Sequence, residues 1–507
     1  MSGLVRLVLV INLGRYALDE TSADAFRHLR GSQAYADALR SLQPQPPFLL
    51  DDETQQLEEA AYALRIFRSR LRFNHFFPTY RVAWDTHVRE AVEAELDDAE
   101  AWLRWTPRIR LTRNGLAVIM LEQAIEDESL IGCVERVLEL RTTSEPGPQG
   151  QWKLGFLLLT MFLEALGQQL VIAAHGRAAV TIAFARQPAD LPSLRLDRYV
   201  IYKARSITCN GELLEADVLK DEYAPTIAAL MEGSLVEDAS GRRFPRYAAD
   251  QSRQLAHSDC SSWDEELCLF TGETALLYSP LVQRGIAYVG GPIGLTAHAY
   301  GTYWAGIMRG IEHVVAFRAE VQQAERRTTD LLAHVPALTR KVNDGDLKPS
   351  DSELINHMAM SLADIFDSLP ELRSMAVSSS AFRADYARRK FERLIEVLDI
   401  KATLELVNTN VEQLNFFISY YGDMRLQWQA QRTNDSNMLI SEIVMFLALS
   451  SFAADTLQVS QFVTQNVEVG EQVIIAVIIA FVTVLVIGWA RRLAHLRRRQ
   501  ERRLFDR

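Results

Sequence analysis

Residues 473–490 form an uninterrupted apolar run, VIIAVIIAFVTVLVIGWA, that contains no charged side chain. At about 1.5 Å per residue, a helix of this length spans about 27 Å, which is close to the hydrocarbon thickness of a bilayer. Trp489 stands near the end of the run, and Arg491 and Arg492 follow directly, as interfacial anchors do. A helix of a water-soluble domain is rarely apolar on every side. The run therefore predicts a transmembrane helix.

A second, weaker apolar segment, MLISEIVMFLALSSFAADTL, precedes it at residues 438–457. A carboxylate is unfavourable against lipid, so we expect Glu442 to face protein, water or the headgroup boundary. The polar residues of this segment favour a helix that lines a water-filled space. An amphipathic or re-entrant segment that lies on the membrane is the alternative. If the segment lines a pore, its candidate pore-lining residues are Asn437, Ser441, Glu442, Ser451 and Asp455. At about 100° per residue they form no single narrow stripe, and Asp455 is alternatively a solvated residue just outside the bilayer.

The charge distribution predicts an orientation for these two segments. The chain of 507 residues has a formal charge of −11, yet its last 17 residues hold eight arginines against two acidic side chains. The linker at 455–472 contains acidic residues and no Lys or Arg. The positive-inside rule then places the chain before the first segment and after the second in the cytoplasm, and the acidic linker outside. We predict a multi-pass protein of the inner (cytoplasmic) membrane with cytosolic N- and C-termini. The acidic balance argues against nucleic acid as a partner.

The first residues, MSGLVRLVLVINLG, favour a strand over a secretory leader. Apolar residues alternate on both sides of Arg6, at Val5, Leu7 and Leu9, which is the period of a buried strand. The apolar run is only about seven residues long and has no small-x-small cleavage site, so we predict no export signal.

Four cysteines in 507 residues are too few for a secreted disulfide framework and fit a reduced cytosolic body. Cys260 and Cys268 lie close to His257 in HSDCSSWDEELC. A zinc site needs about four ligands, and no second Cys/His pair is spaced to complete one. We therefore interpret these residues as structural and leave the metal unknown. No cofactor is certain, although a divalent cation is possible.

Three short turns predict hairpins in the N-terminal body. Asn114-Gly115 and Asn210-Gly211 suit turns that need positive φ at both central residues. Thr271-Gly272-Glu273 separates two further short apolar runs. Hairpins mixed with helices predict an α+β cytosolic body with an antiparallel sheet, rather than a doubly wound parallel one. The body contains no Walker A loop, dinucleotide fingerprint or G-x-S-x-G elbow, so we predict that the chain is not an enzyme.

The segment after Pro370 contains no proline and predicts a long helical stalk. Apolar residues recur there at alternating spacings of three and four, which is a heptad seam. Such a seam needs a partner, either an antiparallel helix of the same chain or the same helix of other subunits. Pro336 and residues 341–351 are predicted to interrupt the earlier helices. A continuous stalk helix over 384–454 is slightly favoured over a bundle with a flexible connection. The predicted oligomer or stalk seam is Val397, Ile400, Leu404, Val407, Val411, Leu414, Ile418 and Tyr421.

Together these features predict an α+β cytosolic body, a long α-helical stalk and two C-terminal transmembrane helices. The predicted regions are 1–145 (N-terminal α+β), 151–300 (second α+β), 301–436 (helical or coiled-coil stalk), 437–490 (two-helix transmembrane domain) and 491–507 (basic cytosolic tail).

This layout resembles the CorA magnesium-channel superfamily over roughly residues 260–507. In that family a stalk helix enters the first span, which lines the pore of a pentamer and ends at a Gly-Met-Asn motif. Here the corresponding stretch at 452–457 reads FAADTL, without that motif. The resemblance implies an oligomeric cation channel or transporter that is regulated by a large cytosolic domain. The alternative is a membrane-anchored sensor or effector, for instance in antiviral defence. Expected partners are the lipid bilayer, further copies of the chain and an unknown cytosolic ligand or protein.

Overall fold

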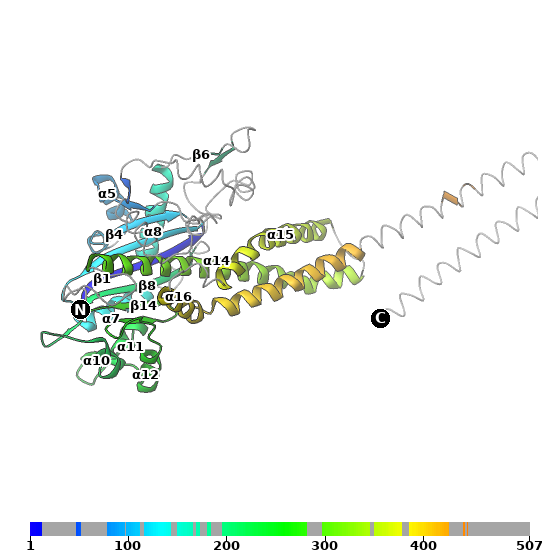
Figure 1. Ribbon diagram of the computed structural model, residues 1–507. Coiled ribbons are helices and arrows are strands. Elements are labelled where there is room, and N and C mark those ends of the chain that lie inside the picture. The colour runs from blue at the N-terminus through cyan, green and yellow to red at the C-terminus, as the bar shows by residue number, and fades with distance from the viewer. Residues whose placement is uncertain are drawn as a thin grey trace, which may run out of the picture. The chain divides into compact units, whose positions relative to one another are not determined.

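The computed structural model describes a central sheet and a group of long helices (Figure 1). The described residues are 1–12, 47–51, 79–96, 98–111, 116–142, 150–165, 169–172, 180–183, 195–280, 297–344, 349–377, 385–424, 440, 441 and 444. The chain divides into two compact units. The first comprises Met1–Thr339 and Leu347–Asn415, and the second comprises Arg340–Asp346 and Phe416–Arg507. The sheet and the contacts described below belong to the first unit.

The described sheet has eight strands in the order β13-β14-β8-β1-β5-β4-β3-β2. The long strand β1 lies in the middle and pairs with β5 on one side and β8 on the other. Strands from both predicted α+β regions therefore share one sheet. The strand bounds are β1 Ser2–Asn12, β2 Phe48–Leu50, β3 Tyr80–Val82, β4 Thr106–Leu111, β5 Leu116–Ile125, β8 Arg195–Ser206, β13 Leu267–Phe270 and β14 Thr274–Tyr278.

Three described strand pairs lie outside this sheet. They are β6 (Gln169–Ile172) with β7 (Val180–Ala183), β9 (Thr208–Cys209) with β10 (Glu212–Leu213), and β11 (Leu235–Glu237) with β12 (Arg243–Pro245).

The three predicted hairpins are confirmed. β4 and β5 are antiparallel neighbours on either side of Asn114-Gly115, and β13 and β14 pair across 271–273. Between β9 and β10, Asn210 has φ 51° and Gly211 has φ 85°, the left-handed values that this turn requires. The prediction of a first, buried strand is also confirmed, because β1 is central in the sheet.

The predicted antiparallel sheet is wrong in one pairing, because β14 runs parallel to β8 with Leu276 opposite Tyr202. The sheet is therefore mixed. Between these strands the chain forms α10 (Ala216–Asp221), α11 (Ala224–Glu232) and α12 (Ala249–His257) before it returns. A parallel neighbour needs such a long crossover connection. Hairpin signals in the sequence report only pairing between adjacent strands, so this pairing was missed.

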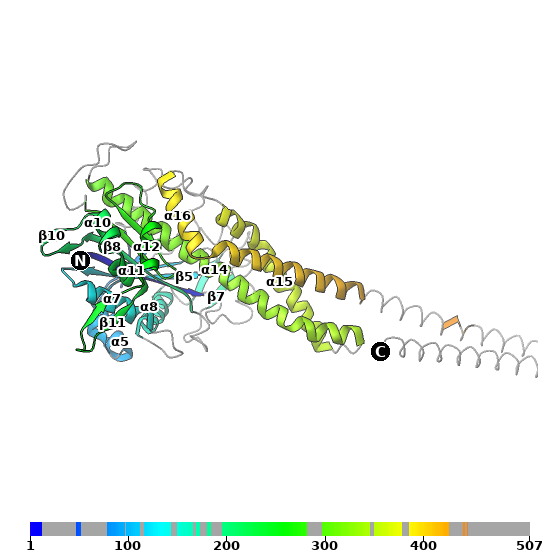
Figure 2. The ribbon, with the colours of Figure 1, turned by 90° about the horizontal axis from the view of Figure 1, so that it is seen from below.

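Both faces of the sheet are covered by helices. On the first face, alternate residues of β1, such as Val5, Leu7 and Leu9, join one apolar core with residues of α7 (Leu130–Thr142) and α8 (Gly150–Ala165). On the second face lies the first part of α14 (Ala297–Asp344), which crosses the sheet in both ribbon views (Figures 1 and 2). The intervening β1 residue Arg6 contacts α14 there. Two short helices, α5 (Thr86–Glu95) and α6 (Ala99–Trp102), complete the described body.

Further along, α14 packs with α15 (Pro349–Val377) and with helical residues 400–415, as both views show. We call residues 322–339, 349–377 and 400–415 the helical bundle. Asn410 Nδ2 donates to Thr328 Oγ1 at 3.2 Å inside it. Helix α14 continues through Pro336 to Asp344, so the predicted interruption at this proline is wrong. A proline removes one helical hydrogen bond, and the buried side chains around it, such as Leu338, hold the helix together.

The continuous stalk helix is also wrong at its start. Helix α16 (Asp385–Val397) ends at a turn, and a second helix covers residues 400–424. Asp399 adopts φ 54°, in the left-handed region that ends a helix. Aspartate is among the few residues that adopt this conformation readily. This is only a weak indication of the break in the sequence.

The fold class needs correction at the membrane as well. In the part of the chain that the structure describes, no helix combines the length and the apolar composition that a bilayer crossing needs. The prediction of two transmembrane helices rested on hydropathy and on the aromatic and basic flanking residues, and neither pattern shows what covers an apolar run. Residues 437–490 lie outside the described residues, apart from 440, 441 and 444, and so does the basic tail at 491–507.

Candidate functional site

Buried ionic contacts fasten helices α14 and α16 to the second face and one edge of the sheet. One group surrounds Glu312 of α14. A second joins Arg318 of α14 to Asp197 of β8. A third holds Lys390 of α16 against the segment that leads into β13. Charged side chains are rarely buried unless they are paired, so these three groups are the most unusual chemistry of the described body.

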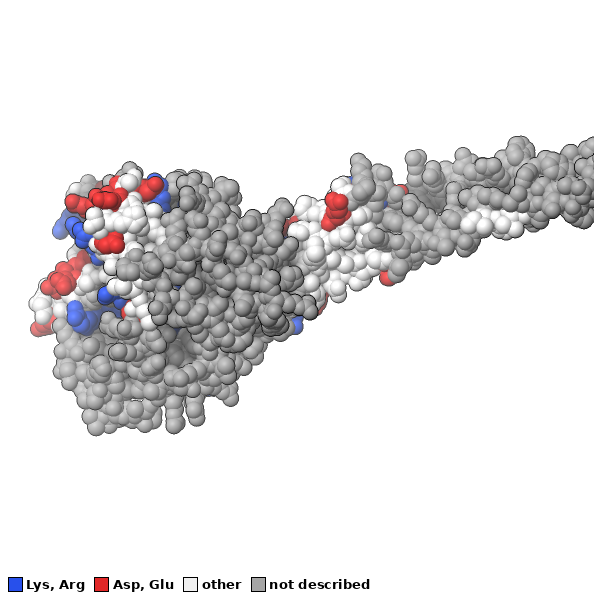
Figure 3. All heavy atoms as spheres, turned by 90° about the horizontal axis from the view of Figure 1, so that it is seen from above, with Lys and Arg blue, Asp and Glu red and all other residues white. Residues whose placement is uncertain are grey.

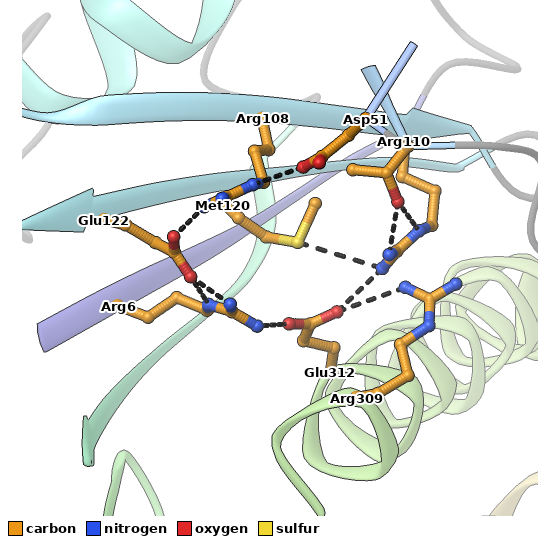
Figure 4. Close-up of polar contacts among 9 residues, drawn as sticks. Arg6, Asp51, Arg108, Arg110, Met120, Glu122, Arg309 and Glu312 are labelled. Carbon is orange, nitrogen blue, oxygen red and sulfur yellow. Dashed lines mark hydrogen bonds and ion pairs between the residues drawn. The ribbon is translucent and has the colours of Figure 1, made fainter. Parts of the chain in front are cut away.

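Glu312 lies among arginines from two strands and from its own helix (Figure 4). Its side chain is only 1 % exposed and accepts a hydrogen bond from Arg110 Nη1 at 2.7 Å. Arg309, one turn earlier on α14, donates to the same carboxylate at 3.1 Å, and Arg6 of β1 pairs with its other oxygen. One carboxylate thus fixes α14 against both β1 and β4.

The network continues across the sheet through a second carboxylate, Glu122 of β5 (Figure 4). Arg6 Nε donates to Glu122 at 2.5 Å, and Arg108 of β4 pairs with the other oxygen of this carboxylate. Arg108 Nε also donates to Asp51 Oδ2 at 2.6 Å. Strand pairing explains the arrangement, because Arg6 lies directly opposite Glu122 in the β1–β5 register. Opposite charges on directly paired residues of one face attract each other.

Arg110 is the most enclosed cation of the network, with 1 % of its side chain exposed. Besides its bond to Glu312, its Nε donates to Thr79 Oγ1 at 3.0 Å, and its Nη1 lies 3.8 Å from Met120 Sδ. A guanidinium has five N–H donors in a rigid plane, so several partners at fixed angles determine its position. Arg110 therefore acts as a rigid connection between the sheet and α14.

The second group is a bidentate pair at the other end of the contact between α14 and the sheet. Arg318 Nε and Nη2 donate to the two oxygens of Asp197 at 2.5 and 2.6 Å, and Nη1 donates to the carbonyl of Gly272 at 2.5 Å. Burial raises the pKa of the Asp197 carboxyl, and the Arg318 guanidinium opposes that rise. The guanidinium also lies over the Tyr199 ring, 5.7 Å from its centroid.

The third group holds α16. Lys390, whose side chain is fully buried, donates to the carbonyl of Cys260 at 3.0 Å and to Ser262 Oγ at 2.9 Å, with Glu266 Oε2 at 4.0 Å. The next residue, Phe391, places its ring against Gly310 of α14, where an added Cβ would overlap the ring. Glycine costs a helix interior about 1 kcal/mol relative to alanine. At Gly310 it opens a notch that admits Phe391.

A further cation on the second face is held under electrostatic strain. Burial lowers the pKa of Lys203 on β8, and the neighbouring positive charges of Arg6 and Arg205 lower it further. The charge of Arg6 therefore affects Lys203 as well as the carboxylates that Arg6 contacts directly.

The structure places the predicted site residues in two different situations. Six seam residues are buried within a single chain, whereas Val397 and Ile418 are half-buried. The buried six are Ile400, Leu404, Val407, Val411, Leu414 and Tyr421. Among the predicted pore-lining residues, Ser441 is helical and exposed. Asn437, Glu442, Ser451 and Asp455 lie outside the described residues.

No group of three or more His, Cys, Asp or Glu side chains in the described ranges is placed to hold a metal ion. Near His257, the Asp259 carboxylate instead accepts hydrogen bonds from the backbone N–H of Cys268, at 2.9 Å, and from Ser261. The thiol of Cys260 donates to the carbonyl of Cys268 at 3.1 Å.

Sequence reasoning missed the ionic network, although a signal was present. Arg108 and Arg110 alternate with apolar residues in β4, and Glu122 ends an apolar run in β5. A charged residue at every second position of a strand is normally taken as a solvent-facing side. Here that side meets Glu312 of α14, about 200 residues later in the chain, and no local pattern predicts such a pairing.

Comparisons with protein-family models, with curated proteins and with solved structures find no match for this chain. The resemblance to the CorA superfamily stays a prediction. The geometry of the chain itself is the remaining ground for assigning a function.

Proposed function

We propose that this chain is a sensor or effector in which the α/β body binds a signal and controls the C-terminal part through α14. The single observation that carries this proposal is that one helix, α14, belongs both to the body and to the helical bundle. Its residues 309–318 are held to the sheet by buried charges, and residues 328–338 pack in the helical bundle. A displacement at the sheet therefore moves the bundle with it.

The buried charges make this contact suitable for switching. Removing one partner of a buried ion pair costs about 3–5 kcal/mol, because the other charge is left uncompensated. A ligand or protein that supplies or takes away a single charge at this face changes the balance by a comparable amount. An energy of this size is enough to invert a two-state population. An apolar contact offers no such sensitivity to one charge.

The proposal assigns no catalytic step to the chain. Acidic and basic side chains lie interspersed on the part of the described body seen in Figure 3, a surface that suits a protein or small-ligand partner better than a polyanion. The channel hypothesis, the bilayer and further copies of the chain as partners, and the inner-membrane location all stay predictions.

A double-mutant cycle tests the coupling. Glu312→Gln perturbs the network, and Asn410→Ala removes the bond to Thr328 in the bundle. Glu312 and Thr328 are 16 residues apart on α14, which is about 24 Å along the helix. Distant, independent sites are additive within about 0.3–0.5 kcal/mol. We expect a clearly larger interaction energy from chemical denaturation of the full chain.

The matched control replaces Glu312→Gln by Glu353→Gln, an exposed carboxylate on α15. The control cycle with Asn410→Ala should be additive. If the cycle through Glu312 is also additive, α14 does not transmit the state of the sheet and the proposed function is wrong.

A further inference from the structure

Two cysteines lie next to each other at the edge of the sheet, beside the contact that holds α16. The backbone N–H of Cys260 donates to the carbonyl of Cys268 at 3.0 Å, and the Cys260 thiol donates to the same carbonyl at 3.1 Å. This backbone N–H···O=C bond sets the two segments at the spacing of hydrogen-bonded chains, about 4.7–4.9 Å. A disulfide spans Cα separations of about 4.4–6.8 Å. The two residues are therefore placed for a disulfide.

The side chains of the two cysteines also interact. Burial raises the pKa of the Cys268 thiol, a hydrogen bond with the Cys260 thiol raises it further, and the ammonium of Lys390 opposes the rise. Both thiols also raise the pKa of the buried Tyr199 phenol, so both lie near this residue of β8.

Access differs between the two residues. Cys268 is fully buried, whereas Cys260 is half-buried and lines an open cleft of about 500 Å³. The cleft lies between the end of α12 and α16 and is lined by Gln254, His257, Ser258, Asp259, Cys260 and Arg393. A small oxidant reaches Cys260 through this cleft, and Cys268 stands behind it. In this order of access, Cys260 is the cysteine that an oxidant meets first and Cys268 is the one placed to resolve it.

We propose that Cys260 and Cys268 are an oxidative modification site, at which a hydroperoxide converts the two thiols into a disulfide. The inference goes beyond the proposed function, because it needs no coupling along α14. First, the Cys260 sulfur attacks an oxygen of the peroxide and gives up its proton as it does so, and the O–O bond breaks. The leaving hydroxide takes the proton of the Cys260 thiol and becomes water, and Cys260 becomes a sulfenic acid.

Second, the Cys268 sulfur attacks the Cys260 sulfur and gives up its proton in the same step. The S–S bond forms and the S–O bond breaks, and the leaving hydroxide takes the proton of the Cys268 thiol. With hydrogen peroxide the balance is two thiols oxidised by two electrons, one peroxide reduced and two waters formed.

The disulfide acts on α16 through the backbone of Cys260. The backbone N–H of Cys268 is bound by the Asp259 side chain rather than by the Cys260 carbonyl. That carbonyl is the acceptor for Lys390. Drawing the Cys260 sulfur towards Cys268 rotates this backbone and weakens its bond to the lysine. Oxidation at the cleft thus loosens the attachment of α16.

The test treats the purified full chain with hydrogen peroxide and maps its cysteines by peptide mass spectrometry. We expect a crosslinked peptide pair containing Cys260 and Cys268 that has lost two hydrogen atoms and is restored by a thiol reductant. Cys260→Ser and, separately, Cys268→Ala each abolish it. The matched control Cys209→Ser, at another half-buried thiol, leaves it intact. Sulfinic acid at Cys260 with Cys268 unmodified overturns the proposal.

A second readout tests the consequence for the helix. Amide exchange over residues 387–395 should become at least about tenfold faster in the oxidised chain, and Lys390→Met should give the same increase without oxidant. If the disulfide forms while exchange in α16 is unchanged, the link to Lys390 is wrong and the modification site stands. Neither result depends on whether α14 couples the sheet to the bundle.

Discussion

The two faces of the central sheet are both buried, yet they are held in different ways. The first face packs against α7 and α8 through apolar side chains such as Leu9 and Leu158. The second face meets α14 through buried charges, with Glu312 and Arg110 each 1 % exposed. Apolar packing is non-directional and grows with buried area, whereas an ion pair in a dry interface depends on geometry and protonation.

This difference suggests a division of labour within one domain. The first face supplies a large apolar contribution to stability, since each fully buried Leu or Val contributes about 1.5–3 kcal/mol. The second face adds a defined register between sheet and helix, and it responds to charge. A sensor needs both: a framework that stays folded and a contact that has two states.

The largest effect is expected on the charged face. Glu312→Gln should lower the free energy of unfolding by about 3–5 kcal/mol, because Arg110 and Arg309 lose their shared carboxylate. Urea denaturation measures this change. The double variant Arg110→Met/Glu312→Leu should recover the part of the loss that belongs to Arg110, because replacing a buried ion pair by apolar residues is often neutral, whereas Arg6 and Arg309 still lose Glu312. If the double variant is less stable than Glu312→Gln, the charges are not the reason for the loss.

On the apolar face, Leu158→Ala in α8 should cost about 3 kcal/mol through lost burial and the cavity left behind. The loss of stability in Leu158→Ala, relative to the wild type, should be the same at low and high salt. The loss of stability in Glu312→Gln should change with salt and pH. Equal salt dependence for the two variants would remove the contrast between the faces.

A smaller effect is expected where α16 meets α14. Gly310→Ala places a methyl group against the ring of Phe391 and should cost about 1–3 kcal/mol by overpacking. The paired variant Gly310→Ala/Phe391→Leu should regain part of this loss by making room, as denaturation measures. A Gly310→Ala variant that is more stable than the wild type, as helix propensity alone predicts, would contradict the notch.

The smallest effect concerns Lys203. Its pKa in the folded chain lies below the ordinary value of 10.5, so the unfolded chain binds more protons in the interval between the two values. Stability should therefore rise with pH in that interval, by no more than about 1.4 kcal/mol per pH unit. Lys203→Met should abolish this part of the slope. An unchanged profile would show that the lysine is not strained.

The sequence was informative about local structure. The alternation around Arg6 predicted β1, and the turns at 114–115, 210–211 and 271–273 predicted three hairpins, all of which are confirmed. These features succeed because period and turn chemistry act between near neighbours. The helical character of residues 400–424 followed from the same kind of pattern.

Long-range structure was not predictable in the same way. The parallel pairing of β14 with β8 and the contact of Arg110 with Glu312 join residues far apart in the chain. Helix-breaking residues also predicted helix ends incorrectly. Helix α14 continues through Pro336, whereas Asp399 ends a run of strong helix formers. Tertiary packing decides such cases, and single-residue propensity does not.

Native-state amide exchange of the Glu312→Gln variant tests the central claim most directly. Exchange should accelerate over residues 400–415 of the bundle, although Glu312 itself lies on the part of α14 that faces the sheet, while residues 154–163 of α8 keep their protection. The exposed-carboxylate variant Glu353→Gln should change neither segment. If residues 400–415 stay protected in Glu312→Gln, or if both segments lose protection together, α14 does not carry the state of the charged face to the bundle.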